Sequence, residues 1–255
     1  MTAQQKTTPS LKKQKVSVGL LLLQMRTFLI LLLLIVFFAW RAENFLTPGT
    51  LVLMARHVAV YAFLAIGMTF VIITGGIDLS VGAIVGLAGM VAGGLIYKGL
   101  PIFGVRIYPR VWVVVLITLG LGALIGAFSG LLVTRFNVPA FIGTLGVLYM
   151  ARGAALLVHQ GQTYPNLAGD PGLKNTGFPE IGAGTFLKIP FTDQGIPYSI
   201  WLLVIVGVVA AYIAAKTPLG RHIYAVGGND RAATLSGVRV NNVKMFVYMF
   251  SGFCS

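Results

Sequence analysis

A single acid lies between two long apolar runs of this sequence, in a segment whose residue types could do chemistry. The segment 74–82 contains Asp78, Ser80 and three glycines. Moving an aspartate to the centre of a membrane helix costs about 3 kcal/mol, so acids at that depth are typically functional. Glycine-interrupted helices also mark the binding regions of transporters. The segment therefore predicts part of a translocation pathway, with Gly75, Gly76, Asp78 and Ser80 as its candidate residues.

Asp78 also has a purely structural explanation. An aspartate at the membrane surface could cap a helix that begins at Leu79 or Ser80, because its side chain accepts hydrogen bonds from the first free N–H groups. Capping alone and capping combined with a pathway role both remain open. A second ionisable residue, Arg152, falls inside another apolar run and is a further pathway candidate. It either extends its long side chain to the interface or pairs within a helix bundle.

The composition indicates an integral membrane protein. Of the 255 residues, 57% are hydrophobic and 10% are charged, which is too apolar for a soluble domain. A spanning helix needs about 20 apolar residues, and the runs lack the alternating polarity of barrel strands. We predict an all-α, polytopic bundle with spans at 20–40, 51–73, 80–97, 111–134, 139–158 and 197–215. A seventh span begins near Met245, and we expect it to be truncated because the sequence ends at Ser255.

The charge of the chain predicts its orientation. A formal charge of +13 would suggest nucleic acid as the partner of a soluble protein, but in a membrane protein Lys and Arg mark the cytoplasmic loops. We therefore place the N-terminal tail, 1–19, and the loop 216–243 in the cytoplasm. The membrane domain, 20–255, then carries an outer loop at 159–196, which forms either a partly ordered cap or a disordered connection. The first apolar run is too long for a cleaved signal peptide.

Small and aromatic residues recur within the spans. Glycines lie four residues apart in three places, and such spacing lets helices pack closely or lines a conduit. The pairs and triplet are Gly82 with Gly86, Gly89 with Gly93, and Gly122 with Gly126 and Gly130. Trp112, Trp201, Tyr149 and Tyr164 fit an interfacial belt, although each could contact a substrate.

Several functional classes lack the residues they need. The sequence has one cysteine, Cys254, and three histidines without metal-ligand spacing, so we expect no metal and no cofactor. It also lacks the glycine-rich, lysine-containing loop that binds nucleotide phosphates, as well as the common hydrolase motifs. We therefore expect no catalytic residues, and any ATP must be hydrolysed by another chain.

The loop 216–243 has the chemistry of an ordered surface. Pro218 stops the preceding span, and Gly227 with Gly228 permits a tight turn. Asn229 or Asp230 can cap a short helix over 232–235, which Gly237 would terminate. About 27 residues are more than a bare connector needs, which favours a surface for a partner.

Read together with the segment 74–82, this loop resembles the permease subunit of bacterial ATP-binding cassette importers for monosaccharides, of the ribose, xylose and galactose type. That group is related to branched-chain amino acid permeases, and the resemblance runs from about residue 44 to the end. It implies a non-catalytic subunit of the bacterial inner membrane that forms a pore with a second permease, in a homodimer or a related heterodimer. Two cytoplasmic ATPases and a periplasmic sugar-binding protein would complete the importer. Members of the family carry further spans after this loop.

The resemblance also assigns roles to residues. It implies that the loop 220–240 is a cytoplasmic coupling element that docks on the ATPase, with its short helix at 232–236. The residues that carry this match are Gly220, Arg221, Gly227, Gly228, Asn229, Ala232, Ala233, Ser236 and Gly237.

Other functions remain as alternatives. An ion-coupled secondary transporter would use Asp78 and Arg152 as relay groups, but it would not need the loop at 216–243. A membrane enzyme would need converging catalytic groups that the sequence does not offer, and a purely structural membrane protein is the remaining class. Within the importer reading, the substrate could also be a branched-chain amino acid or a furanose-type signal molecule.

Overall fold

The computed structural model describes residues 25–188 and 194–255. The predicted tail and the first five residues of the first predicted span lie outside these ranges. The chain divides into two compact units, with the boundary between Leu51 and Val52. In the first unit, α2 (Arg26–Arg41) is a continuous apolar helix between two arginines. A turn follows it, in which the main-chain oxygen of Asn44 accepts hydrogen bonds from the hydroxyl groups of Thr47 and Thr50.

The second unit is a bundle of apolar helices. Its long helices are α3 (Pro48–Ile73), which begins in the first unit, α4 (Val81–Tyr97), α5 (Val111–Thr134), α6 (Ala140–Val158), α8 (Tyr198–Lys216) and α11 (Val240–Phe253). Within the described residues, α3, α5, α6 and α8 are long and apolar enough to cross a membrane. The prediction of an all-α polytopic protein is confirmed. The helix limits follow the predicted spans closely, except that α11 begins at Val240 rather than at Met245.

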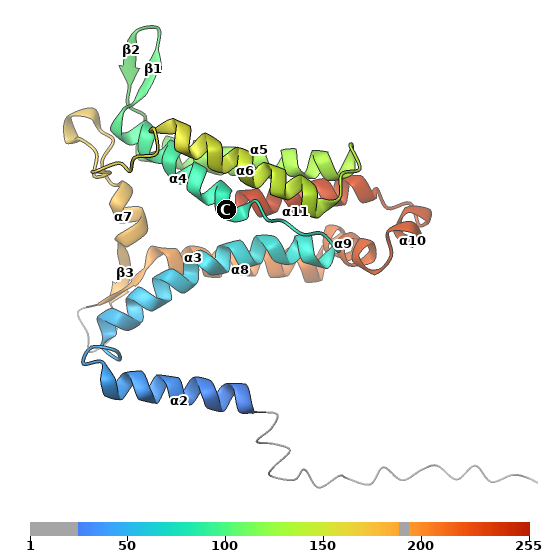
Figure 1. Cartoon of the computed structure of the whole chain (residues 1–255), viewed down its shortest axis with the longest axis horizontal. Coiled ribbons are helices and arrows are strands. Elements are labelled where there is room, and N and C mark those ends of the chain that lie inside the picture. Colours follow the sequence, from blue (N-terminus) through green and yellow to red (C-terminus); the bar gives the residue numbers. More distant parts are fainter. Residues whose placement is uncertain (1–24, 189–193) are drawn as a thin grey trace, which may run out of the picture. The chain divides into compact units, whose positions relative to one another are not determined.

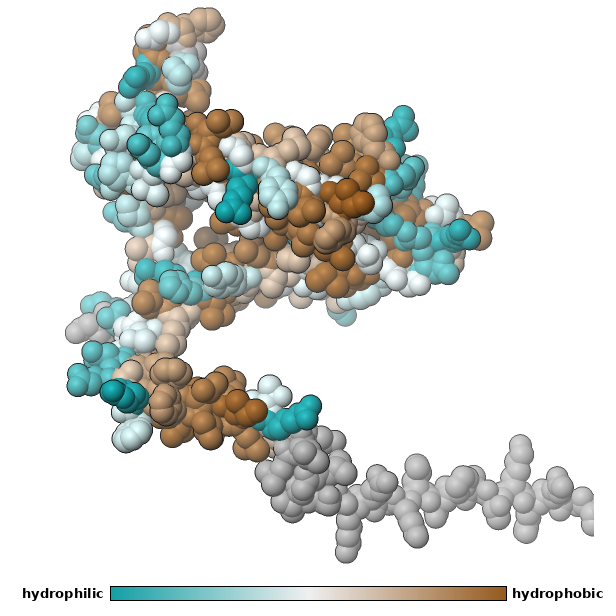
Figure 2. All heavy atoms as spheres, in the orientation of Figure 1, coloured by the Kyte–Doolittle hydropathy of each residue, from teal (hydrophilic) through white to brown (hydrophobic). Residues whose placement is uncertain are grey.

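Short elements lie at the two ends of this bundle (Figure 1). One end, which we call the hairpin end, has the antiparallel pair β1 (Leu100–Ile102) and β2 (Val105–Ile107). It also has η1 (Pro171–Leu173), α7 (Phe178–Ala183) and the pair β3 (Thr185–Lys188) and β4 (Gly195–Pro197). The opposite end, the α10 end, has α9 (Pro218–Gly228) and α10 (Asp230–Leu235). Figure 2 shows hydrophilic residues gathered at both ends and hydrophobic residues along the helices between them.

Glycines allow α5 and α11 to pack backbone against backbone. A β carbon on Gly122 would collide with the carbonyl oxygen of Gly252, and one on Gly126 would collide with that of Tyr248. A β carbon on Gly130 would lie 3.0 Å from the sulfur and 3.2 Å from Cα of Met245, so this glycine also permits a close approach. The predicted packing role of this glycine triplet is therefore confirmed.

The glycines of α4 behave differently from that prediction. Gly93 is covered by the ring of Tyr164, but Gly82, Gly86 and Gly89 have open space where a side chain would lie. Within the described residues, no other helix packs against this face of α4. The packing prediction therefore fails for Gly82 and Gly86, because α5 and α6 contact other faces of α4.

α4 begins at mid-depth in the bundle. Its 17 residues span about 25 Å, whereas the 24 residues of α5 span about 36 Å. Ile84, one turn into α4, lies against Gly122 at the midpoint of α5. The segment 74–80 therefore leaves the end of α3 and runs back into the bundle without helical structure before α4 starts. This is a broken helix rather than a surface turn.

Candidate functional site

Asp78 is buried at this break, and its carboxyl group accepts three hydrogen bonds. Oδ1 accepts from the main-chain N–H of Ser80 at 3.0 Å and from its hydroxyl at 2.6 Å. Oδ2 accepts from Oγ of Ser251, on α11, at 2.9 Å. Only 1% of the surface of Asp78 is exposed. Protein groups thus satisfy both carboxyl oxygens, which offsets the cost of taking them out of water.

The capping prediction for Asp78 is wrong in its location and its partners. α4 begins at Val81 and its N-cap residue is Ser80, so Asp78 precedes the helix by more than one residue. The carboxyl group binds the N–H of Ser80, two residues ahead, as in an Asx turn, and reaches across to α11 as well. Asp78 therefore ties a non-helical segment to a distant helix.

Two further side chains hold the main chain beside Asp78. The carbonyl oxygen of Ile77 accepts hydrogen bonds from Oγ1 of Thr144 on α6 at 3.3 Å and from Oη of Tyr248 on α11 at 3.4 Å. Both bonds are long, and both donors are buried. The Tyr248 hydroxyl also lies 2.6 Å from the position of a β carbon on Gly76. α6 and α11 thus fix the break from two sides.

Gly75 and Gly76 terminate α3. Gly75 has a positive φ of 75°, a conformation that side chains disfavour. Its N–H donates to the carbonyl of Ile72 at 2.9 Å, and that of Gly76 donates to the carbonyl of Val71 at 3.0 Å. This pair of bonds is the Schellman arrangement, which satisfies free carbonyls at a helix end. The two glycines therefore turn the chain from α3 into the break.

The segment 216–243 contains two helices rather than a loop. Oδ1 of Asn229 accepts from the N–H groups of Arg231 and Ala232 at 3.0 Å each, and Gly237, with a φ of 84°, ends α10. The prediction of a short helix with these two limits is confirmed, with Asn229 as the cap. The predicted turn at Gly227 and Gly228 is wrong, because both residues form the last turn of α9.

α9 lies across the ends of two spanning helices, and its glycines permit the contact. A β carbon on Gly220 would collide with the carbonyl oxygens of Ile213 and Ala214 at the end of α8. Gly227, two turns later on the same face, would collide with the carbonyl oxygen of Ile73 at the end of α3. Ile223 and Val226, also on α9, are buried in one core with Phe70 and Val71 of α3. The segment 216–243 therefore abuts the end of α3, where the break starts.

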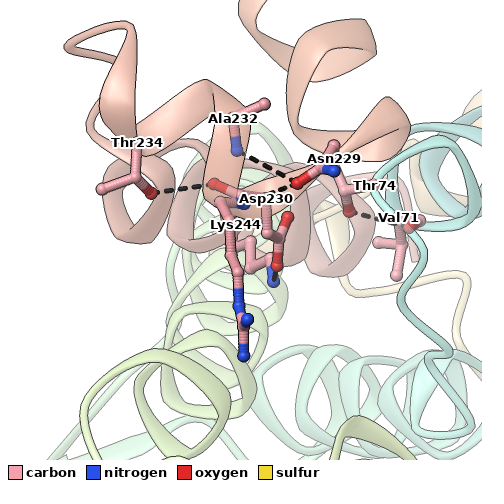
Figure 3. A network of polar contacts seen from close by, with 8 residues as sticks. Val71, Thr74, Asn229, Asp230, Ala232, Thr234 and Lys244 are labelled. Carbon is pink, nitrogen blue, oxygen red and sulfur yellow. Dashed lines mark hydrogen bonds and ion pairs between the residues drawn. The ribbon is translucent and has the colours of Figure 1, made fainter.

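α10 is attached to α11 as well. Nζ of Lys244 forms an ion pair and hydrogen bond with Oδ2 of Asp230. Ala233 is buried in the same core as Val243 and Val247 of α11. Figure 3 shows Asn229, Asp230, Ala232 and Thr234 of this helix together with Lys244, and in the same view Val71 and Thr74 at the end of α3.

The remaining predicted residues lie apart from this cluster. Arg152 is exposed on α6, and among residues 25–188 and 194–255 no carboxyl group pairs with it. The structure thus does not bring it to Asp78. At the α10 end, Arg221, Gly228, Ala232 and Ser236 are exposed, so they belong to a surface rather than to the break.

At the hairpin end, part of the predicted outer loop is ordered. The Asn175 side chain is buried, donating to the carbonyl of Ile96 on α4 at 3.0 Å and accepting from the N–H of Asp170 at 2.7 Å. The ring of Tyr164 stacks on that of His159, with 4.3 Å between the ring centroids, and it covers Gly93. Burial raises the pKa of the Tyr164 phenol above its ordinary value. Its ring packs on the last turns of α4.

Sequence reasoning missed Ser251 and Tyr248, which contact the break from α11. No local pattern marks them, because they follow Asp78 by more than 160 residues and lie in an ordinary apolar run. In the described part of the chain, no group of three His, Cys, Asp or Glu side chains could hold a metal ion. The chemistry available at the break is therefore hydrogen bonding around one buried carboxyl group.

Comparisons with known proteins give a consistent picture. Residues 50–255 match the sequence profile of a family described as the permease component of the branched-chain amino acid transport system. The chain is 37% identical to the ribose import permease protein of Haemophilus influenzae over 238 residues, 93% of this chain and 68% of that protein. It is 34% identical to the ribose import permease protein of Bacillus subtilis, over 89% of this chain and 64% of that protein.

A third relative is named for a different sugar. The chain is 36% identical to the galactofuranose transporter permease protein of Escherichia coli over 202 residues, 78% of this chain and 52% of that protein. The chain thus spans about two thirds of the length of the ribose permeases and about half of this third relative. No solved structure was found to match it.

Proposed function

Because this chain belongs to the family of branched-chain amino acid transport system permease components, we propose that it is the pore-forming permease subunit of an ATP-driven sugar importer. The observation that carries the proposal is the contact between α9 and the end of α3, from which the break at 74–80 departs. A surface on which an ATPase could act thus shares one hydrophobic core with the helix end that leads into the break. An ion-coupled carrier has no use for such a surface.

The proposed substrate is a monosaccharide. Relatives at 34–37% identity are named ribose import permeases, and another is named a galactofuranose permease. A pentose, or a hexose in its furanose form, is the chemistry that these names share. Ribose is the first sugar to test, with galactofuranose as the second.

The translocation pathway is proposed to pass the break. Discontinuous helices at mid-depth mark binding regions in transporters, since their free main-chain groups must face protein or an aqueous cavity. Gly75 is exposed beside Asp78, and Gly82 and Gly86 leave the following face of α4 without side chains. In this proposal, Asp78 and Ser80 hold the shape of the pathway wall, while the glycine face of α4 borders the pathway.

The proposed assembly needs other chains. Two cytoplasmic ATPases would dock at α10, a second permease subunit would complete the pore, and a periplasmic binding protein would deliver the sugar at the hairpin end. This arrangement puts the N-terminus and the α10 end in the cytoplasm, and the multi-pass chain in the bacterial inner membrane. The charge distribution supports it, because Lys216, Arg221, Arg231, Arg239 and Lys244 all lie near the α10 end. The permease itself would not hydrolyse ATP.

Co-purification and uptake test the proposal together. The permease is expressed with the ATPase encoded beside its gene, once intact and once without residues 232–236. We expect the intact permease to retain the ATPase and, with its binding protein in proteoliposomes, to import ribose when ATP is supplied. The deletion should insert normally and lose both properties. An intact permease that retains no ATPase, yet accumulates sugar with an ion gradient, would contradict the proposal.

A further inference from the structure

One apolar side chain stands out on the polar surface of the α10 end. Leu235, the last residue of α10, is 91% exposed, which is the greatest exposure of any leucine in the described residues. Its neighbours Arg231, Thr234 and Ser236 are also exposed but polar. An isolated exposed leucine is ordinary on a protein surface. Its surroundings distinguish this one.

The helix that carries Leu235 is rigidly built. Asn229 caps its start, Oγ1 of Thr234 bonds to the carbonyl of Asp230 at 2.8 Å, and the N–H of Val238 bonds to the carbonyl of Ala233 at 3.0 Å. Ala233 is buried, and the Asp230–Lys244 pair attaches the helix to α11. Leu235 is therefore presented in a fixed position, and a partner need not order the helix in order to bind it.

The charges around Leu235 are positive and unpaired. Asp230 is the single acid between residues 194 and 255, and Lys244 already pairs with it. In the part of the chain that the structure describes, no carboxyl group forms an ion pair with Arg221, Arg231 or Arg239. Such a surface complements carboxylates on whatever contacts it, and it would raise the rate of association at low salt.

We infer that Leu235 is the anchor by which α10 binds the ATPase, and that it enters an apolar pocket of the ATPase rimmed by carboxylates that face Arg231 and Arg239. This inference rests on the proposed function, which supplies the partner but not the residues. A lipid surface is the competing occupant of a basic patch. A helix that lies on lipid needs a broad apolar face, whereas α10 offers one leucine among small and polar residues. A protein pocket fits one side chain better.

The test measures the affinity of the permease, held in nanodiscs, for the ATPase at low and high salt. Complete burial of a leucine contributes about tenfold to a hundredfold in affinity, so we expect Leu235→Ala to weaken binding about tenfold at both salt concentrations. Arg231→Glu with Arg239→Glu should slow association and flatten its salt dependence. The control variants are Leu157→Ala, at another largely exposed leucine that lies on α6, and Lys174→Glu at the hairpin end, both of which should bind as the unmodified permease does.

The outcomes separate this inference from the proposed function. If deletion of 232–236 abolishes binding but Leu235→Ala does not weaken it, the importer stands and the anchor is wrong. If the intact permease binds no ATPase, both are wrong. If the arginine variants change binding only in nanodiscs that contain anionic lipid, the basic patch belongs to the membrane and the carboxylate-rimmed pocket is wrong.

Discussion

The carbonyl oxygen of Ile73, in the last turn of α3, occupies the space that a side chain on Gly227 of α9 would need. These residues are 154 positions apart, and one belongs to the proposed pathway region while the other belongs to the proposed coupling segment. A close approach of main-chain atoms therefore joins α9 directly to the helix end that leads into the break.

Gly227→Ala is expected to displace α9 from α3. Because the obstructing atom belongs to the backbone, the helices must separate, at a cost of about 1–3 kcal/mol. We expect sugar uptake to fall more than ATP hydrolysis does, measured in the same proteoliposomes. Gly228→Ala is the matched control, since open space surrounds that residue. Equal uptake by the two variants would show that the contact does not contribute to coupling.

Asp78→Asn is expected to preserve the fold and impair transport. An asparagine can still accept from Ser80 and donate to Ser251, so the hydrogen-bonded geometry survives, while the acidic group in the proposed pathway wall is replaced by a neutral amide. Asp78→Ala leaves the buried hydroxyl groups of Ser80 and Ser251 without their acceptor, at about 1–3 kcal/mol each. Thermal unfolding and uptake are measured for both variants. Unimpaired uptake by Asp78→Asn would leave Asp78 with a structural role only.

Gly126→Ala is expected to destabilise the bundle. Its β carbon would meet the Tyr248 carbonyl and the Gly252 backbone, so α5 and α11 must separate, at about 1–3 kcal/mol. Gly120→Ala on the same helix faces open space and should be neutral or slightly stabilising, since alanine favours helix over glycine by about 1 kcal/mol. The melting temperatures of the two variants in detergent give the comparison. Indistinguishable values would contradict the close packing of α5 and α11.

Asn175→Ala is expected to loosen the outer segment without unfolding the bundle. The substitution removes the bond to the Ile96 carbonyl, which lies on α4, and the bond from the Asp170 N–H. Hydrogen exchange should increase over 166–184 and remain unchanged in α5. Asn166→Ala is the control, because its side chain is exposed and bonds only to the nearby Ala168 N–H. Unchanged exchange at 166–184 in Asn175→Ala would mean that other contacts hold the segment.

The sequence predicts the helices of this protein well and their depth poorly. Apolar runs of about 20 residues locate the spans, and local capping chemistry locates α10 between Asn229 and Gly237. Both signals lie within the element that they describe. Hydropathy alone cannot distinguish a turn at the surface from a segment that re-enters the bundle, so the capping interpretation puts Asp78 too near the interface.

The contacts of the site depend on residues far apart in the chain. Ser251 and Tyr248 reach the break only because Gly122, Gly126 and Gly252 bring α5 and α11 together. The Gly227–Gly228 pair reads locally as a turn, since each glycine costs a helix about 1 kcal/mol. Contacts with the end of α3 and the shared core outweigh that cost, and the pair becomes helical.

At Gly227, α9 and α3 meet through main-chain atoms on both sides, and this gives the contact a mechanical property. A side chain at such a contact can change rotamer when its neighbour moves. A glycine in contact with a carbonyl oxygen has no side-chain torsion that could change. A displacement of α9 toward α3 at this point would therefore have to displace the end of α3 as well. A substitution that inserts a flexible side chain here would convert a stiff joint into a compliant one.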